Sequence, residues 1–177
     1  MRVSLLDTEP APEVEAAAVR IFEDALADLA PRSLRHHGNV FAAAWDGEEV
    51  VGAACLSWED GAVAGFRQAL EDHGHLMDEP SCILESLAVE PGHRGRGIGS
   101  ALIRELLAEA RRLGYARVYS TALLRESCGS RGPLLAAGFL PMGAGRMPLR
   151  EPADSRCRLC GGETCSCLVE PLECVLA

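Results

Sequence analysis

The segment Leu84–Ala101, with the sequence LESLAVEPGHRGRGIGSA, constrains the fold of this chain more than any other stretch. An alternating apolar run ends at Glu90-Pro91, a loop rich in glycine and arginine follows, and a helical pattern begins directly after it. Glycines let backbone N–H groups come close to an anion, and a helix N-terminus adds roughly half a positive charge. The segment therefore predicts a phosphate-binding turn between a strand and a helix.

The familiar nucleotide motifs do not fit this turn. The chain contains no lysine, so all 17 of its basic residues are arginines. A Walker A loop needs a lysine after its second glycine, and pyridoxal phosphate chemistry needs a lysine Schiff base, so both are excluded. The glycines at 95, 97 and 99 also lack the G-x-G-x-x-G spacing of a dinucleotide-binding turn. A plain tight turn with a helix cap remains the alternative to a phosphate site.

The motif Arg-x-x-Gly-x-Gly at residues 94–99, preceded by Leu-Ala-Val at 87–89, resembles the acetyl-CoA-binding motif of the GNAT N-acetyltransferase superfamily. The resemblance covers roughly residues 40–142 and continues through a helical pattern over 100–113, a strand-like run over 116–120 and the step Ala137-Gly138-Phe139. It implies an α/β (α+β) fold with a mixed, mostly antiparallel central sheet of about six to seven strands, flanked by helices.

The remaining patterns agree with such a fold. Residues 2–6 read as a strand, apolar spacing from Val14 to Leu29 predicts a helix, and Asp46-Gly47 predicts a tight hairpin between strands at 40–45 and 50–58. Residues 60–80 include helical spacing, and this insertion either walls the acceptor side of a site or packs on the edge of the sheet. We expect an acetyltransferase core over 1–150, and a cysteine-rich knuckle with a final strand, at 172–176, over 151–177.

The resemblance also implies how coenzyme A would bind. The backbone of Leu87, Ala88 and Val89 would pair with the pantetheine arm. Ser127 would bond the cofactor as well. The N–H groups that would hold the pyrophosphate belong to Arg94, Gly95, Arg96, Gly97, Ile98, Gly99 and Ser100.

For the reaction, the resemblance implies attack of a primary amine, on a small molecule or a peptide, on the acetyl thioester. Glu85 is the candidate general base, acting through water, and its alternative role is a strand carboxylate paired with an arginine. Many family members carry a tyrosine acid five residues before the Gly-Phe aromatic, where this chain has Leu134. Tyr119 is the second candidate catalytic residue, although strand parity leaves its direction open. A coenzyme-binding sensor without strong catalysis is the alternative function.

Four cysteines near the C-terminus form a C-x2-C-x4-C-x-C pattern at Cys157, Cys160, Cys165 and Cys167. Four thiolates at this spacing suit tetrahedral Zn²⁺, and the segment has too few apolar residues to fold by burial. We expect a structural zinc knuckle. Disulfides and a reduced tail are the alternatives.

Charge and hydropathy set further expectations. The net charge of −9 argues against nucleic acid as a partner, whereas residues 90–117 carry six arginines against three glutamates and suit a phosphorylated ligand. No apolar run reaches 18 residues, and the N-terminus has no basic stretch followed by an apolar one. We expect a cytoplasmic protein without membrane association, and a homodimer is possible.

Overall fold

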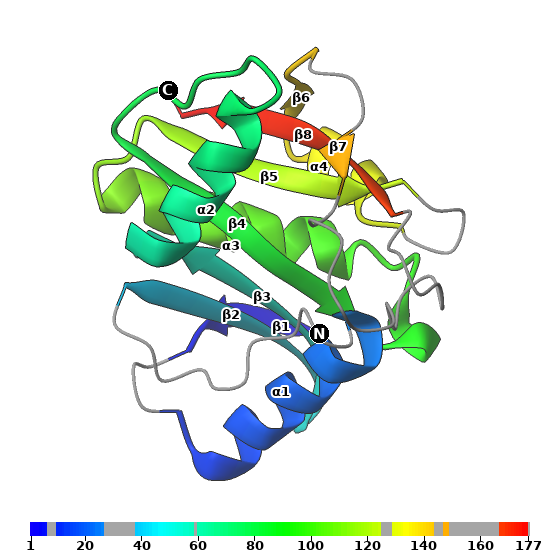
Figure 1. Ribbon diagram of the computed structural model, residues 1–177. Coiled ribbons are helices and arrows are strands. Elements are labelled where there is room, and N and C mark those ends of the chain that lie inside the picture. The colour runs from blue at the N-terminus through cyan, green and yellow to red at the C-terminus, as the bar shows by residue number, and fades with distance from the viewer. Residues whose placement is uncertain are drawn as a thin grey trace.

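The computed structural model describes residues 1–6, 10–26, 38–58, 60–124, 129–143, 147–148 and 167–176. Figure 1 shows how these elements are arranged. In chain order they are β1 (Arg2–Leu5), α1 (Pro12–Leu26), β2 (Asn39–Asp46), β3 (Glu49–Ser57), α2 (Asp60–Glu71), β4 (Ser81–Val89), the 3-10 helix η2 (Pro91–His93), α3 (Ile98–Arg112), β5 (Arg117–Leu123), α4 (Arg131–Ala136), β6 (Leu140–Pro141), β7 (Met147–Pro148) and β8 (Leu168–Val175).

One mixed sheet organises the chain. Its strand order is β1-β2-β3-β4-β5-β8-β6, and β7 pairs with β8 beside β6, so the sheet is seven strands wide. β4 and β5 run parallel, and every other described pairing is antiparallel. The expected mixed, mostly antiparallel sheet flanked by helices is confirmed.

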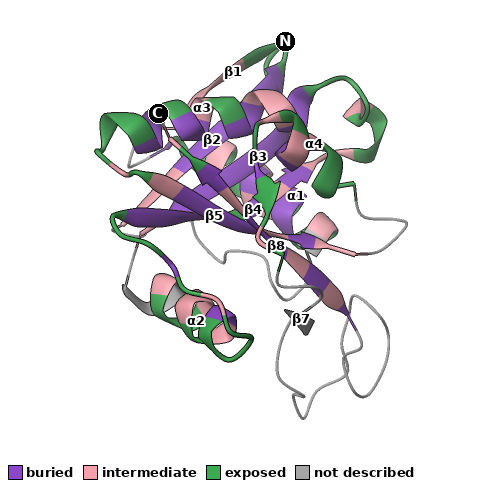
Figure 2. Cartoon of the chain, turned by 90° about the horizontal axis from the view of Figure 1, so that it is seen from above, coloured by how far each residue is buried: buried purple, intermediate pink, exposed green. Residues whose placement is uncertain are grey.

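Helices cover both faces of the sheet. α3 and α4 pack on one face, and α1 and α2 pack on the other. Figure 2 shows the buried strands between α3 and α2. α2, which corresponds to the insertion expected at 60–80, packs on the sheet face through Phe66 and Leu70 over Ile83, Tyr119 and Val169. No helix among the described residues is both long enough and apolar enough to span a membrane.

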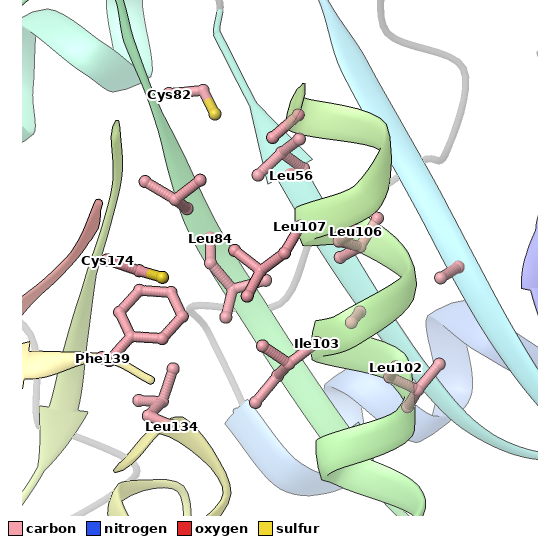
Figure 3. Packing of buried hydrophobic residues seen from close by; sticks show 14 of the residues in the cluster. Leu56, Cys82, Leu84, Leu102, Ile103, Leu106, Leu107, Leu134, Phe139 and Cys174 are labelled. Atoms are coloured by element: carbon pink, nitrogen blue, oxygen red, sulfur yellow. The ribbon is translucent and has the colours of Figure 1, made fainter. Parts of the chain in front are cut away.

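α3 forms the centre of the larger core. Its apolar residues recur at three- and four-residue spacing, and Leu102, Ile103 and Leu106 are completely buried. They pack on strand residues that include Leu56 and Leu84, as Figure 3 shows. The spacing of apolar residues in the sequence therefore determines which side of α3 packs against the sheet.

The C-terminal strand is an integral part of the sheet. β8 runs over Leu168–Val175 and begins four residues earlier than the strand expected at 172–176. It lies between β5 and β6, with Val169, Leu172 and Cys174 buried. Residues from the end of the chain therefore complete the core on which the site rests.

Gly52 of β3 lets the start of α3 lie close to the sheet. A Cβ at this position would stand 3.2 Å from Ile98 Cγ2 and 3.3 Å from both Leu102 Cδ1 and the Ala88 carbonyl oxygen. A glycine within a strand often marks such a close approach. Sequence reasoning missed this residue, although a glycine inside the run 50–56 was a visible signal.

We predict that Gly52→Ala lowers the free energy of unfolding by about 1–3 kcal/mol, because the added methyl overpacks the contact between α3 and the sheet. Chemical denaturation measures the change. Gly65→Ala in α2 is the matched control, since nothing lies within 4 Å of its added Cβ. That variant should be stabilised by about 0.5–1 kcal/mol. Equal effects of the two substitutions would contradict the packing argument.

Candidate active site

The two central strands part in the middle of the sheet. β4 and β5 pair from Ser81 with Arg117 to Leu84 with Ser120, and their pairing ends there. Among the described strands, β4 beyond this point pairs only with β3, and β5 pairs only with β8. We call this parting of β4 from β5 after Leu84 and Ser120 the fork. Leu87–Val89 pair with β3 on one side, and on the side toward β5 they have no strand partner among the described residues, so an extended ligand can bind along that side.

Glu85 is the first residue of β4 beyond the fork, and it lies in a β-bulge. Leu84 pairs with Leu56 of β3 and Ser86 pairs with Cys55, so Glu85 falls at the register shift between these two pairs. A bulge inserts one residue into a strand and redirects its side chain. Burial raises the pKa of the Cys55 thiol, which belongs to the cluster under α1, and the nearby Glu85 carboxylate raises it further.

The Glu85 side chain is exposed even though β4 is a central strand with helices on both faces. Along β4, Ile83 belongs to the apolar cluster under α2, and Ala88 belongs to the cluster under α1. Glu85 lies between these two clusters. Solvent can therefore reach its carboxylate.

The turn after β4 has the backbone that the sequence predicts for an anion site. Gly95 and Gly97 adopt left-handed conformations, with φ of +75° and +78°, and Gly97 is the N-cap of α3. The cap has no side-chain hydrogen bond, and the first turn of α3 has no acidic residue. The N–H groups of Ile98, Gly99 and Ser100 therefore have no side-chain cap and can bind an anion.

The arginines of this region have different surroundings. Arg112 is bonded to Glu109, and Arg117 forms ion pairs with Asp78 and Glu173. Arg94 donates from Nε to the Val89 carbonyl oxygen at 2.9 Å, which ties the turn to the end of β4. Arg94 and Arg96 are both exposed, and neither forms an ion pair with another described residue. Positive charge at the turn therefore comes from these two side chains.

Ionisable side chains that sequence reasoning missed surround the end of β4. Arg20 of α1 lies 3.3 Å from Glu90, and His93 lies 3.4 Å from Asp46 at the end of β2 and 3.9 Å from Glu90. These contacts join α1, the hairpin after β2 and the turn. No spacing in the sequence indicated them, because the residues come from separate segments.

Tyr119 faces α2 and is buried, with 1% of its surface exposed. Its hydroxyl accepts a hydrogen bond from the Asp78 N–H at 2.9 Å, and burial raises its pKa. Asp78 precedes β4, so the hydroxyl is held near the start of β4 and away from the residues beyond the fork. The other tyrosine, Tyr115, precedes β5 and packs against Trp58.

Three of the residues that the sequence analysis singled out around α4 are described, and one is not. Leu134, at the position counted back from Phe139, is 1% exposed and belongs to the core around α3. Phe139 is fully buried, and Gly138 before it has a φ of +96°, as the Gly-Phe step requires. Ser127 lies outside the described residues.

Three of the four cysteines expected to bind zinc, Cys157, Cys160 and Cys165, lie outside the described residues. Cys167 is described and is buried directly before β8. Within the described ranges, no group of three or more His, Cys, Asp or Glu side chains is placed to hold a metal ion. The zinc knuckle stays a prediction from the sequence.

The fold and the site together define a mixed α/β protein whose sheet opens beside a glycine-rich turn at the start of a helix. The model of the Acetyltransferase (GNAT) family matches residues 4–128, more than half of the chain. The chain therefore belongs to the GNAT acetyltransferase family, and the predicted enzyme class, an acyltransferase, is confirmed at the level of the family.

Individual proteins add detail to this family membership. A stretch of 62 residues is 42% identical to mycothiol acetyltransferase from Nocardia farcinica (strain IFM 10152), covering 35% of this chain and only 19% of that protein. An N-acetyltransferase from Staphylococcus aureus Mu50 is similar in structure, with a TM-score of 0.65, 14% identity and full coverage of both chains. Ribosomal-protein-alanine N-acetyltransferase from Brucella melitensis has a TM-score of 0.64 and 20% identity, covering 99% of this chain and 100% of that one. At these identities the structural likeness shows the fold alone.

Proposed function

We propose that this protein is an N-acetyltransferase that transfers an acetyl group from acetyl-CoA to a primary amine. The observation that carries the proposal is the fork, which leaves the backbone of Leu87–Val89 open directly beyond an exposed carboxylate, Glu85. The glycine turn at the end of the same strand supports it. A thioester with a phosphorylated tail fits this order of features along one strand.

In the proposed complex, the turn binds the charged end of acetyl-CoA. The N–H groups of residues 94–100 hold the pyrophosphate, and Arg94 and Arg96 supply positive charge. The pantetheine arm lies along Leu87–Val89 as an added strand would, which places its thioester near the bulge at Glu85. The hydrogen bond from Arg94 to Val89 leaves Leu87 and Ala88 as the principal backbone partners.

In the proposed reaction, the amine nitrogen attacks the acetyl carbonyl carbon and a C–N bond forms. A backbone N–H of β4 stabilises the oxyanion, the C–S bond then breaks with its electron pair leaving on the coenzyme A thiolate, and the second proton of the amine nitrogen passes to solvent. Glu85 accepts the proton of the ammonium acceptor through a water molecule, so that a neutral amine attacks. An exposed position between the clusters of α1 and α2 suits a group that must meet both water and an acceptor.

Neither of the two positions considered for a general acid suits that role. Tyr119 is the second candidate catalytic residue from the sequence, but its buried hydroxyl accepts a hydrogen bond from the Asp78 N–H, so we propose a packing role for it in place of catalysis. Leu134 has no proton to donate. Coenzyme A thiolate can leave without protonation, and we therefore propose that the reaction proceeds without a tyrosine acid.

The lack of a tyrosine acid also favours a second function. The protein would then bind acetyl-CoA but turn it over weakly, as a sensor or an interaction module, and would need no general acid. Calorimetric titration with acetyl-CoA and thiol release with a panel of small-molecule and peptide amines separate the two. Binding with amine-dependent thiol release supports the enzyme, and binding without release supports the sensor. Absence of binding would contradict both.

We further propose a structural zinc ion bound by Cys157, Cys160, Cys165 and Cys167. The carrying observation is their spacing in the sequence, because four thiolates this close along a chain favour tetrahedral Zn²⁺. We predict one zinc per chain by elemental analysis, and its loss in Cys157→Ser and Cys160→Ser. Cys174→Ala, a change within β8, is the control that should retain the metal. Purified protein without zinc under reducing conditions would contradict the prediction.

A further inference from the structure

Ser120 of β5 is a buried polar residue at the last paired position before the fork. It is 4% exposed, and its hydroxyl donates to the Leu84 carbonyl oxygen at 2.9 Å. Val118 and Ala122, two residues away on either side, lie in the apolar core around α3. A buried hydroxyl in such surroundings needs a partner, and here the partner is the backbone of the neighbouring strand.

The Ser120 hydroxyl donates its hydrogen bond to Leu84, which is the last residue of β4 before the fork. Leu84 pairs with Leu56 of β3 on one side and with Ser120 on the other. The bulge at Glu85 follows immediately, and the strands separate at the same point. Leu84 is therefore held from both neighbouring strands just before β4 turns away from β5.

We propose that Ser120 is a positioning residue that sets where β4 and β5 part, and so fixes the slot for the pantetheine arm. This inference rests on the proposed function, because it assigns a part of the acetyl-CoA site. Without the hydroxyl, the Leu84 carbonyl loses a buried partner and the end of the pairing loosens. The turn at 94–100 follows the other end of β4, so the binding of phosphate groups there should not depend on Ser120.

The test compares two ligands in calorimetric titrations of the full chain. Coenzyme A uses both the slot and the turn, whereas 3′-phosphoadenosine 5′-diphosphate lacks the pantetheine arm and uses the turn alone. We expect Ser120→Ala to raise the Kd of coenzyme A by about tenfold, the usual effect of losing a buried hydrogen bond. The Kd of the nucleotide should stay at the wild-type value.

Ser57→Ala is the matched control, since Ser57 is a buried serine at the end of β3 outside the fork. It should leave both constants unchanged. Should Ser120→Ala fail to fold, Ser120→Cys keeps the side-chain size with a weaker donor and gives the same comparison. Unchanged coenzyme A affinity, or equal weakening of both ligands, would overturn the role of Ser120. Failure of the wild-type protein to bind either ligand would instead overturn the proposed function.

Discussion

Replacing Glu85 with glutamine is expected to lower kcat/KM for the amine by about 10²–10⁴-fold, the usual contribution of a general base. The substitution keeps the size of the side chain and its place in the bulge, but an amide cannot take up a proton at neutral pH. The Kd of acetyl-CoA should remain that of the wild type, because the turn and the backbone of Leu87–Val89 are untouched. Steady-state kinetics and calorimetry measure the two quantities.

Glu71→Gln, at the exposed end of α2, is the control for a change in net charge on the same face of the molecule. It should leave kcat/KM within twofold of the wild type, roughly the range of an exposed charge screened by salt. A Glu85→Gln enzyme with full activity would show that Glu85 has only its alternative role, a paired carboxylate of the strand. A loss of acetyl-CoA affinity in that variant would point to damage to the fork.

Gly97→Asp is expected to raise the Kd of acetyl-CoA by at least about 100-fold, because two like charges about 4 Å apart near a protein surface repel by about 4 kcal/mol. The residue is exposed at the N-cap of α3, and nothing lies within 4 Å of its added Cβ, so the carboxylate would enter the space where the pyrophosphate is proposed to bind. Calorimetric titration with acetyl-CoA measures the loss.

Gly114→Asp separates this repulsion from backbone strain. Gly114 follows α3 with a φ of +88°, close to the +78° of Gly97, and its added Cβ also meets nothing within 4 Å. Both variants should lose about 1–2 kcal/mol of unfolding free energy, since both force a side chain into a left-handed conformation. Only Gly97→Asp should lose affinity for acetyl-CoA. Equal affinity in the two variants would contradict the anion site at the turn.

Local sequence patterns predicted many of the helices and strands of the fold. The helical period predicted α3 over 100–113, and the structure places it at Ile98–Arg112. The Asp46-Gly47 pair predicted the hairpin between β2 and β3, where Gly47 has a φ of +63°. These features depend on neighbours within a few residues, so one sequence contains their cause. The start of β8 at Leu168 depends on pairing with distant segments, and the sequence placed this strand four residues too late.

The sequence by itself determined the glycine turn, the helix it begins and the strand before it, because backbone conformation and side-chain period are local properties. The tertiary structure alone decided that Glu85 lies in an exposed bulge, that Tyr119 faces α2, and that Ser120 bonds Leu84. Each of these depends on which residues of β3, β5 and the loop before β4 lie opposite one another. Register across a sheet is set by packing between segments far apart in the chain, and a shift of one residue reverses the direction of every side chain.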